Sequence, residues 1–461
     1  MTPAEKLQLD IEDFWRIHRG LEAYMGLGPK ETLERLKLHP EDAFCEIGSL
    51  DGTGKLLCTR DAMQAIYDLA ERQVNSLPVS NDYSTDEIAQ SIRKNLARVM
   101  VEEKADEPTL SRVLSLAETE SKSKHSERTF HFPCWLFRPQ QVSRFRIGPV
   151  GFTAAEEFFR VKADDFMRYV EKDSHREISI QRVEGFKKHV ADVGWIATVA
   201  IPPCSISRAE NRAKRAIAAA IDLMRLLLGN RYAQDIRLHQ ASQARVSYGE
   251  HALEENGELN LVMFRRSPEA LVGDDWHEVM KQSEPFWSRA AHLLGATAAG
   301  TRSEIAERMI DALRWFGEAA FEPAPGTQIV KFVAALERLT TTEQLSTRTF
   351  CARIALLSWD DEHTLEQRFW DANAIYDARS RVVHGDLSPT SVHFAKQLNL
   401  AHDVTRTALF RGLEMHCKLD DAGATSTLED LHSFFEGEES KNKGRLSTLF
   451  EQFKKAKKRR I

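Results

Sequence analysis

The spacing of apolar residues divides the chain into regions of different character. Residues 1–125 show the three-to-four-residue spacing of amphipathic helices, most clearly over Ala4–Met25 and Thr85–Glu103. The polar run SLAETESKSKHSER, which begins at Ser115, predicts an exposed linker or loop after these helices. We find no chemical motif in this region, and the DGTG run at Asp51–Gly54 is typical of a turn. The sequence therefore predicts a helical N-terminal region whose role it does not indicate.

From Thr129 the pattern changes to short runs rich in aromatic and β-branched residues, bounded by Gly and Pro, and these predict strands. The runs are TFHFPCWLF, RFRIGPVGF and WIATVAIPP, with ARVSYGE and LNLVMFRRS further on. Between the two sets lies a predicted helix that ends at Gly229, and Ser207 and Glu210 are expected to form its capping box. Residues 126–300 are thus predicted to be an α+β module with a sensor or regulatory role.

From Thr301 the pattern is wholly helical, and a second capping box is expected between Thr301 and Glu304. Four segments each carry a stripe of apolar residues that predicts one buried face. The stripes are Ile305, Met309, Ala312 and Phe316; Ile329, Val333, Leu336 and Thr340; Phe350, Ile354 and Leu357; and Leu365, Phe369, Ala372 and Tyr376. A last helix is expected from Pro389 to about His416. Residues 301–420 are therefore predicted to form an all-α bundle, followed by a charged, flexible tail over 421–461.

The fold class predicted from these patterns is an α+β multidomain protein that is mostly helical. The chain has 461 residues, of which 42% are hydrophobic and 29% charged, with a formal net charge of −6. This charge gives no global attraction to nucleic acid, so an RNA ligand would need a local patch. The six cysteines form no CxxC pair, which argues against a zinc ribbon or a disulfide framework. An acidic N-terminal stretch and the lack of a long apolar run predict a cytoplasmic protein without membrane segments.

One stretch, residues 375–390 (IYDARSRVVHGDLSPT), places Arg379 and His384 shortly before Gly385, a residue that suits the position after a helix end. The stripe of the fourth segment, extended through positions 376, 379 and 383, places Arg379 where an apolar residue is expected. A buried arginine needs a partner, and Glu337 is the expected one. On an ideal helix Arg379 and His384 point about 140° apart. They can therefore converge only if the helix loosens or if two chains pool their residues.

These segments together resemble the HEPN superfamily, and within it the Apea-like group, whose members typically show a YDxRSxxVHG segment after an upstream LE helix. The residues that carry the resemblance are, in order, Leu336-Glu337, Tyr376, Arg379-Ser380 and His384-Gly385. The resemblance covers about residues 304–417, roughly a quarter of the chain. It implies a helical bundle that forms a homodimer along the motif helices and cleaves RNA as a metal-independent endoribonuclease. Asp386 stands where one subgroup has a tyrosine, so that subgroup's nucleotidyltransferase partner is not expected.

The resemblance implies that Arg379 and His384 are the catalytic pair. An imidazole can take or give a proton near neutral pH, and a guanidinium offers phosphate a permanently charged fork, so both suit attack by the ribose 2′-OH. The supporting residues would be Glu337, Ser380, Arg381 and Tyr376. No metal and no cofactor is expected. The implied setting is prokaryotic antiviral defence or growth arrest, with the N-terminal regions restraining the nuclease until a phage- or stress-derived trigger arrives.

Other interpretations stay open at this point. The bundle could be a non-catalytic RNA-binding or scaffold module, in which Arg379 pairs with Glu337 for stability and His384 merely ends a helix. The segment HGDLSP also resembles the catalytic loop of aminoglycoside-type phosphotransferases, HGDLxxxN, with Asp386 as the base. However, position 391 is serine, and the loop is expected to lie between helices instead of strands.

Two further patterns carry less weight. Asp274, Asp275 and His277 could hold a metal, although such a group is more often a solvated helix start. The spacing of Arg379 and His384 also occurs at Arg411 and His416, so spacing alone does not identify a site.

Overall fold

The chain is mostly helical with small sheets, as expected, and separates into two compact units. The first comprises Met1–Arg128 and Ile201–Arg212, and the second Thr129–Ala200 and Ala213–Ile461. The computed structural model describes residues 2–48, 55–100, 107–136, 143–172, 174–191, 193–229, 236–238, 248–255, 258–265, 276–301, 303–342, 346–420 and 426–458. The expected boundary at residue 125 lies close to the first break between the units, whereas those at 300 and 420 fall inside the second unit.

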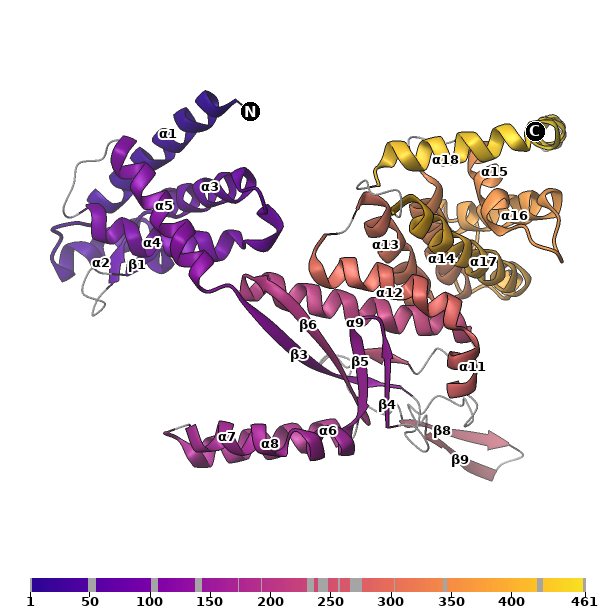
Figure 1. The fold of residues 1–461 in the computed structure, drawn as a ribbon, viewed down its shortest axis with the longest axis horizontal. Helices are drawn as coiled ribbons and strands as arrows, with labels where there is room; N and C mark the ends of the chain where they lie inside the picture. Colours follow the sequence, from indigo (N-terminus) through magenta and orange to yellow (C-terminus); the bar gives the residue numbers. More distant parts are fainter. Residues whose placement is uncertain are drawn as a thin grey trace. The chain divides into compact units, whose positions relative to one another are not determined.

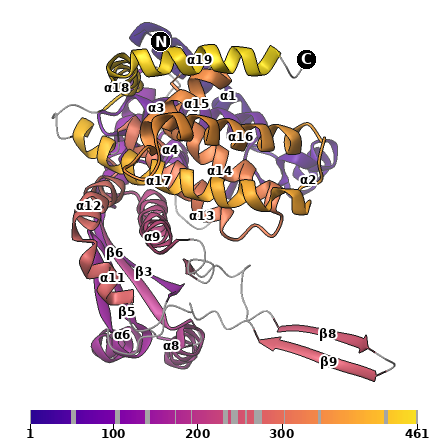
Figure 2. The same ribbon diagram turned by 90° about the vertical axis from the view of Figure 1, so that its right-hand side faces the viewer.

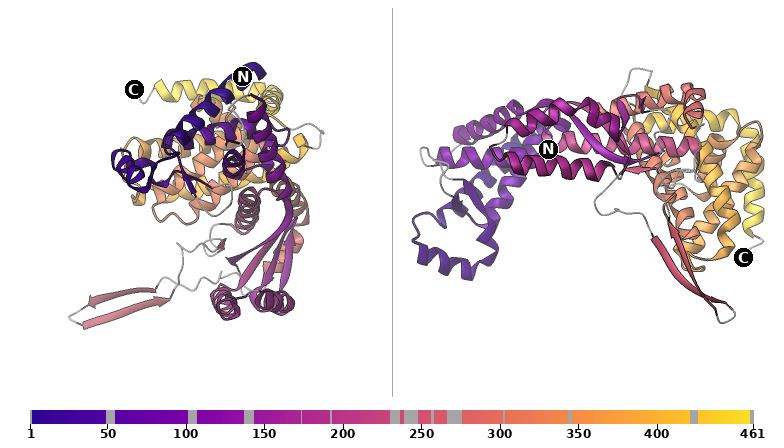
Figure 3. Two further views of the ribbon diagram at one scale, coloured as in Figure 1. Left: turned by 90° about the vertical axis from the view of Figure 1, so that its left-hand side faces the viewer. Right: turned by 90° about the horizontal axis from the view of Figure 1, so that it is seen from below.

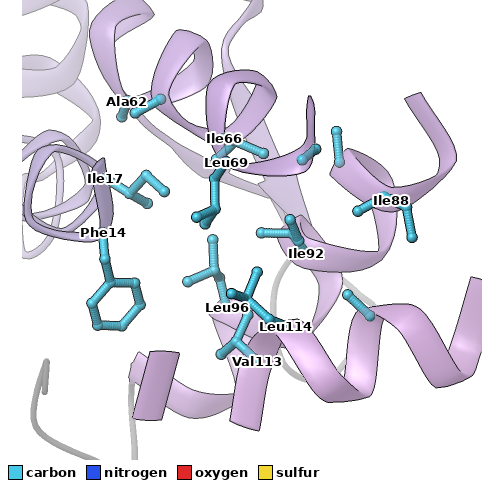
Figure 4. Close-up of a cluster of buried hydrophobic side chains, with 14 of the residues drawn as sticks. Phe14, Ile17, Ala62, Ile66, Leu69, Ile88, Ile92, Leu96, Val113 and Leu114 are labelled. Atoms are coloured by element: carbon cyan, nitrogen blue, oxygen red, sulfur yellow. The ribbon is translucent and has the colours of Figure 1, made fainter. Parts of the chain in front are cut away.

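The first unit is built on amphipathic helices and one short hairpin. The elements are α1 (Pro3–Glu22), α2 (Pro29–Leu38), β1 (Glu46–Gly48), β2 (Lys55–Leu57), α3 (Arg60–Ser76), α4 (Thr85–Met100) and α5 (Glu107–Ser123). Figure 4 shows their buried side chains converging, with Ile17 of α1, Leu69 of α3 and Leu96 of α4 in one cluster. The helix expected at Thr85–Glu103 is confirmed over the described residues, and the helix expected at Ala4–Met25 is confirmed as far as Glu22.

The linker predicted from Ser115 onward is wrong. Helix α5 continues through this polar run to Ser123, and strand β3 begins at Ser126. The reason is that Ala117 and Ser121, one helical turn apart, are both buried against the unit's core. These two small residues at helical spacing keep this part of the helix packed on the core, although the three residues between them are polar.

A five-stranded sheet begins the second unit, and its order is β4-β5-β6-β3-β7. The strands are β3 (Ser126–Trp135), β4 (Arg144–Ile147), β5 (Val150–Ala154), β6 (Trp195–Cys204) and β7 (Arg237–Leu238). Helices α6 (Ala155–Val161), α7 (Ala163–Lys172) and α8 (Arg176–Ala191) connect β5 to β6 (Figure 1). A separate antiparallel hairpin joins β8 (Tyr248–Glu255) and β9 (Glu258–Arg265). The strands predicted in TFHFPCWLF, RFRIGPVGF, WIATVAIPP and LNLVMFRRS are confirmed over the described residues, whereas most of ARVSYGE lies outside them.

Helix α9 (Ile206–Leu228) follows β6. The predicted capping box of Ser207 and Glu210 is wrong, because the helix begins at Ile206. The hydroxyl of Ser205 accepts the backbone N–H of Arg208 at 3.4 Å instead, so the cap lies two residues earlier than expected.

The remainder of the second unit is a helical bundle (Figure 2). Helix α11 (Trp276–Gln282) precedes the bundle. The elements of the bundle are α12 (Glu284–Ala299), α13 (Glu304–Ala319), α14 (Pro325–Thr340), α15 (Thr347–Ser358), α16 (Leu365–Val383), the 3₁₀ turn η4 (Val392–Phe394) and α17 (Ala395–Asp420). The three predicted stripes on α13, α14 and α15 are buried throughout. Ser303, and not Thr301, caps α13. The last helix begins at Ala395 instead of Pro389, whose carbonyl accepts the backbone N–H of Gly326 at 2.7 Å.

The tail over 421–461, which was predicted to be flexible, is mostly helical in its described residues. It forms α18 (Leu428–Lys441) and α19 (Lys443–Lys458), which pack on α15 and α16 and are coloured yellow in Figure 3. Phe435 is fully buried, and the guanidinium of Arg353, itself 3% exposed, lies 4.8 Å from its ring. The few apolar residues of each tail helix fall on one face of that helix. The many charged residues around them made this pattern hard to recognise in the sequence. Within the described ranges no helix is long and apolar enough to cross a membrane.

Candidate active site

Helix α16 ends in the manner that its sequence predicts. His384 is the C-cap residue and donates its backbone N–H to the carbonyl of Ser380 at 2.9 Å. Gly385 follows with a φ of +81°, the left-handed conformation that glycine adopts without strain. The backbone N–H of Leu387 then returns to the carbonyl of Arg381 at 3.2 Å, which tightens the turn. The side chain of His384 is exposed on this turn.

The expected burial of the motif face is correct only for the first half of α16. The buried residues of the helix are Leu365, Arg368, Phe369, Ala372, Ile375 and Ala378. From Phe369 onward the buried residues follow one another at intervals of three. Three residues turn the helix by about 300°, which is about 60° short of a full turn, so the buried face rotates around the helix. Val383 is consequently 51% exposed, and the side chain of Arg379 lies at the margin with 27% of its surface exposed. The predicted burial of Arg379 is therefore only partly correct, because its side chain lies at the edge of the buried face.

Arg379 is held loosely. The predicted ion pair is confirmed, but its Nη2 lies 3.9 Å from Oε1 of Glu337, which is a long separation. Its guanidinium also lies 5.7 Å from the ring of Tyr376, a weak cation–π contact. No hydrogen bond reaches this guanidinium from any residue that the structure describes. Its donors therefore remain available to an external acceptor such as phosphate.

Glu337, on α14, faces Arg379 from the neighbouring helix. Partial burial raises the pKa of its carboxyl group, and the positive charge of Arg379 opposes that rise without cancelling it. A carboxylate that is poorly solvated and weakly paired can orient a guanidinium but does not saturate it. This arrangement fits the orienting role that the family resemblance implies for Glu337.

Helix geometry keeps Arg379 and His384 apart within one chain. Among the described residues, no hydrogen bond or ion pair joins them. Arg381 is exposed, and the side chain of Ser380 is half-buried between them along the helix. Five residues of helix place the two side chains about 140° apart, and the turn at Gly385 begins too late to reverse this. Convergence would therefore require a second chain.

A groove beside Arg379 was not expected from the sequence. It has a volume of about 590 Å³, and its lining includes Glu337 and Tyr376 together with Arg308, Arg338 and Trp315. Trp315 is 38% exposed, so its indole is only partly open to solvent. Positions 308, 311 and 315 share the polar face of α13, so a tryptophan at this spacing was the signal that the sequence offered. The exposed indole offers a surface on which a base could stack, whereas Arg308 already donates to the carbonyl of Thr341 and Arg338 already pairs with the carboxylate of Asp311.

The competing motifs fare differently. His416 is fully buried in α17, so the Arg411–His416 spacing marks a core position. Asp386 is exposed in the turn between α16 and α17, a helix-flanked position unlike a kinase loop. Asp274 and Asp275 lie outside the described residues, as does the side chain of His277.

Comparison of the chain with protein-family models, with curated proteins and with solved structures found no match. The chemistry of the site follows from its own groups. A guanidinium with unused donors can bind a phosphodiester, and an exposed imidazole one turn further along the chain can transfer a proton.

Proposed function

We propose that this protein is a metal-independent endoribonuclease of the HEPN type. The observation that carries the proposal is the state of Arg379. Its guanidinium has one ion pair at 3.9 Å and no hydrogen bond among the described residues, beside a groove with an exposed tryptophan. Arg353 and Arg368, by contrast, are 3% and 1% exposed and spend their donors on protein acceptors. An arginine kept at the surface with its donors unused suits an anionic substrate.

In the proposed reaction the imidazole of His384 takes the proton of a ribose 2′-OH. The O2′ atom then attacks the adjacent phosphorus, and the P–O5′ bond breaks. Arg379 binds the non-bridging oxygens and stabilises the charge that develops on them. The leaving O5′ receives a proton from water, and His384 returns the proton it took to solvent. The products are a 2′,3′-cyclic phosphate and a 5′-hydroxyl. Arg381 provides a second phosphate contact, Ser380 a polar contact, and Glu337 with Tyr376 orients Arg379.

The active species is proposed to be a homodimer formed along α16. The 140° separation of Arg379 and His384 in one chain motivates this, because a second copy can supply the missing member of the pair. Two exposed valines near the turn support it. Val383 is 51% exposed and Val392 is 82% exposed, and such side chains favour burial against a partner.

The biological setting follows from the family likeness alone. We propose a cytoplasmic role in prokaryotic antiviral defence or growth arrest, in which residues 1–300 restrain the nuclease until a phage- or stress-derived trigger acts. Once this restraint is removed, the nuclease would stop the growth of the cell that expresses it.

The direct test is cleavage of a single-stranded RNA by the purified chain in EDTA, with analysis of the product ends. The proposal expects 2′,3′-cyclic phosphate ends, and no cleavage of the same oligonucleotide with 2′-deoxyribose throughout. Cleavage that requires magnesium, or that also cuts the deoxy substrate, would exclude attack by the 2′-OH.

A second candidate is a non-catalytic RNA-binding scaffold, and the groove beside Trp315 is the observation that favours it. The scaffold predicts that RNA binds with micromolar or better affinity and remains intact over hours in the presence or absence of metal. Loss of binding in Trp315→Ala would then locate the RNA in the groove.

A further inference from the structure

Three potential metal ligands meet at the far end of the bundle, where α12 packs against α17. His292 lies on α12, and His416 and Asp420 lie one turn apart on α17. One ligand atom of each residue lies within 4.8 Å of the other two. None of these residues takes part in the candidate active site. The family resemblance implies no metal, and no sequence pattern indicated this cluster, because His292 is far from the other two residues along the chain.

The distances match those of a tetrahedral metal site. Nε2 of His292 lies 3.4 Å from Oδ2 of Asp420, and Nδ1 of His416 lies 3.6 Å from the same oxygen. With metal–ligand bonds of about 2.0–2.1 Å, neighbouring ligands of a tetrahedral ion lie roughly 3.3 Å apart. Small side-chain movements would therefore bring all three atoms onto one ion. Residues four apart on a helix share a face, which is why His416 and Asp420 can act together.

The two oxygens of Asp420 have separate surroundings. Oδ1 accepts the hydroxyl of Ser303 at 3.1 Å and also the hydroxyl of Ser426. Oδ2 faces the two imidazoles. Hydrogen bonds to the outer oxygen of a ligating carboxylate fix its orientation in metal sites, and the two serines provide this arrangement. Ser303 caps α13 and Ser426 lies just before α18, so the cluster connects four helices.

Exposure of the ligands is graded in a way that suits metal entry. The side chain of His416 is 0% exposed, that of Asp420 is 14% and that of His292 is 42%. An ion can therefore reach the cluster from solvent past His292, while two ligands hold it from inside. A fourth position remains for water.

The geometry points to a structural site for a divalent transition-metal ion, zinc foremost, held by His292, His416 and Asp420. Two imidazoles and one carboxylate are ligands that zinc accepts, whereas magnesium prefers oxygen ligands alone. The ion fastens the C-terminal end of α17 to α12 and, through Ser303 and Ser426, holds the starts of α13 and α18. This site is independent of the proposed nuclease chemistry.

The test uses the full chain without an affinity tag, stripped of metal, and titrated with Co²⁺ and then Zn²⁺. We expect one equivalent of Co²⁺ to give the visible absorption of a four-coordinate ion, and Zn²⁺ to displace it. Saturating Zn²⁺ should raise the melting temperature by about 5 °C or more, and Mg²⁺ should not.

The variants separate this cluster from adventitious binding. His292→Ala removes the exposed ligand with little risk to folding and should weaken Zn²⁺ binding at least about 100-fold, and Ser426→Ala about 10-fold. His432→Ala is the matched control, because His432 and Glu436 also lie four apart on a helix, 3.2 Å from each other, and it should bind as the wild type does. Equal affinity in wild type and His292→Ala, or no binding by the wild type, would overturn the site.

Discussion

Arg368 lies in the interior of the bundle with 1% of its side chain exposed, whereas Arg379, about three turns later on the same helix, has 27% exposed. The guanidinium of Arg368 donates to the carbonyl of Ser358 at 3.0 Å and to the carboxylate of Asp403 at 2.8 Å, and also meets His363 at 3.1 Å. Among the described residues, Arg379 has the long pair with Glu337 and a distant contact with the ring of Tyr376, and no hydrogen bond. The donors of the first arginine are bonded to protein acceptors, whereas those of the second have no hydrogen-bond partner among the described residues.

The histidines of the two regions differ in the same way. His402 of α17 packs inside the bundle, with its ring centroid 5.5 Å from that of Phe316 and 5.8 Å from that of Phe332. His384 projects from the exposed end of α16. The comparison teaches that residue type does not separate a structural position from a functional one. What differs between the two regions is how far the fold encloses each side chain.

The largest expected effects, on stability and on cleavage rate, come from replacing each of the two arginines by alanine in turn. Arg368→Ala leaves buried acceptors and carboxylates without their cation and should lower the free energy of unfolding by about 3–5 kcal/mol. Arg379→Ala should change it by less than about 0.5 kcal/mol, yet lower the rate of RNA cleavage by about 10²- to 10³-fold. Urea unfolding and single-turnover cleavage measure the two quantities. A large loss of stability in Arg379→Ala would remove the distinction on which the comparison depends.

The interior histidine predicts a pH dependence of stability. Burial, helped by the nearby charge of Arg406, lowers the pKa of His402 to about 4 from its ordinary value of 6.5. The unfolded chain therefore binds more protons than the folded chain between these values. Stability should fall by up to about 3 kcal/mol as the pH drops from 6.5 to 4.

His402→Gln tests this, since it removes the titrating group while keeping a polar side chain. Urea midpoints measured at several pH values should fall less steeply with acid in the variant than in the wild type. Parallel curves for the two proteins would show that the acid sensitivity arises elsewhere.

A smaller effect is expected at the groove. Trp315→Ala removes an exposed aromatic surface on which a base can stack, a contact worth roughly 1–3 kcal/mol. The KM for RNA should rise about tenfold while kcat changes little, because the indole binds the strand away from the reacting phosphate. Trp359→Ala is the control, since Trp359 is 44% exposed but does not line the groove. A change in kcat alone would place Trp315 in the chemistry instead of in binding.

Local sequence signals predicted much of this molecule. The stripes on α13 to α15 are buried as expected, Gly385 takes the left-handed conformation, and Glu337 lies opposite Arg379. These features depend on neighbours along one helix or on two facing stripes. The spacing of residues along the sequence was therefore enough to predict these features.

The rest depends on tertiary contacts that no local pattern encodes. The rotation of the buried face along α16 follows from how its neighbours cross it, and it moved Arg379 to the margin. The burial of Phe435 turned an expected flexible tail into a pair of packed helices. The groove at Trp315 and the cluster of His292, His416 and Asp420 join residues far apart in the chain.

The central claim is that the end of α16 cleaves RNA, and His384 tests it most directly. The measurement is the single-turnover rate of RNA cleavage in EDTA by wild type, His384→Ala and His393→Ala at equal concentrations of folded protein. His393 is the matched control because it is an exposed histidine on the same connection between α16 and α17. We predict that His384→Ala is about 10²- to 10⁴-fold slower, while His393→Ala retains the wild-type rate and all three proteins melt alike. Cleavage by His384→Ala at the wild-type rate would contradict the account.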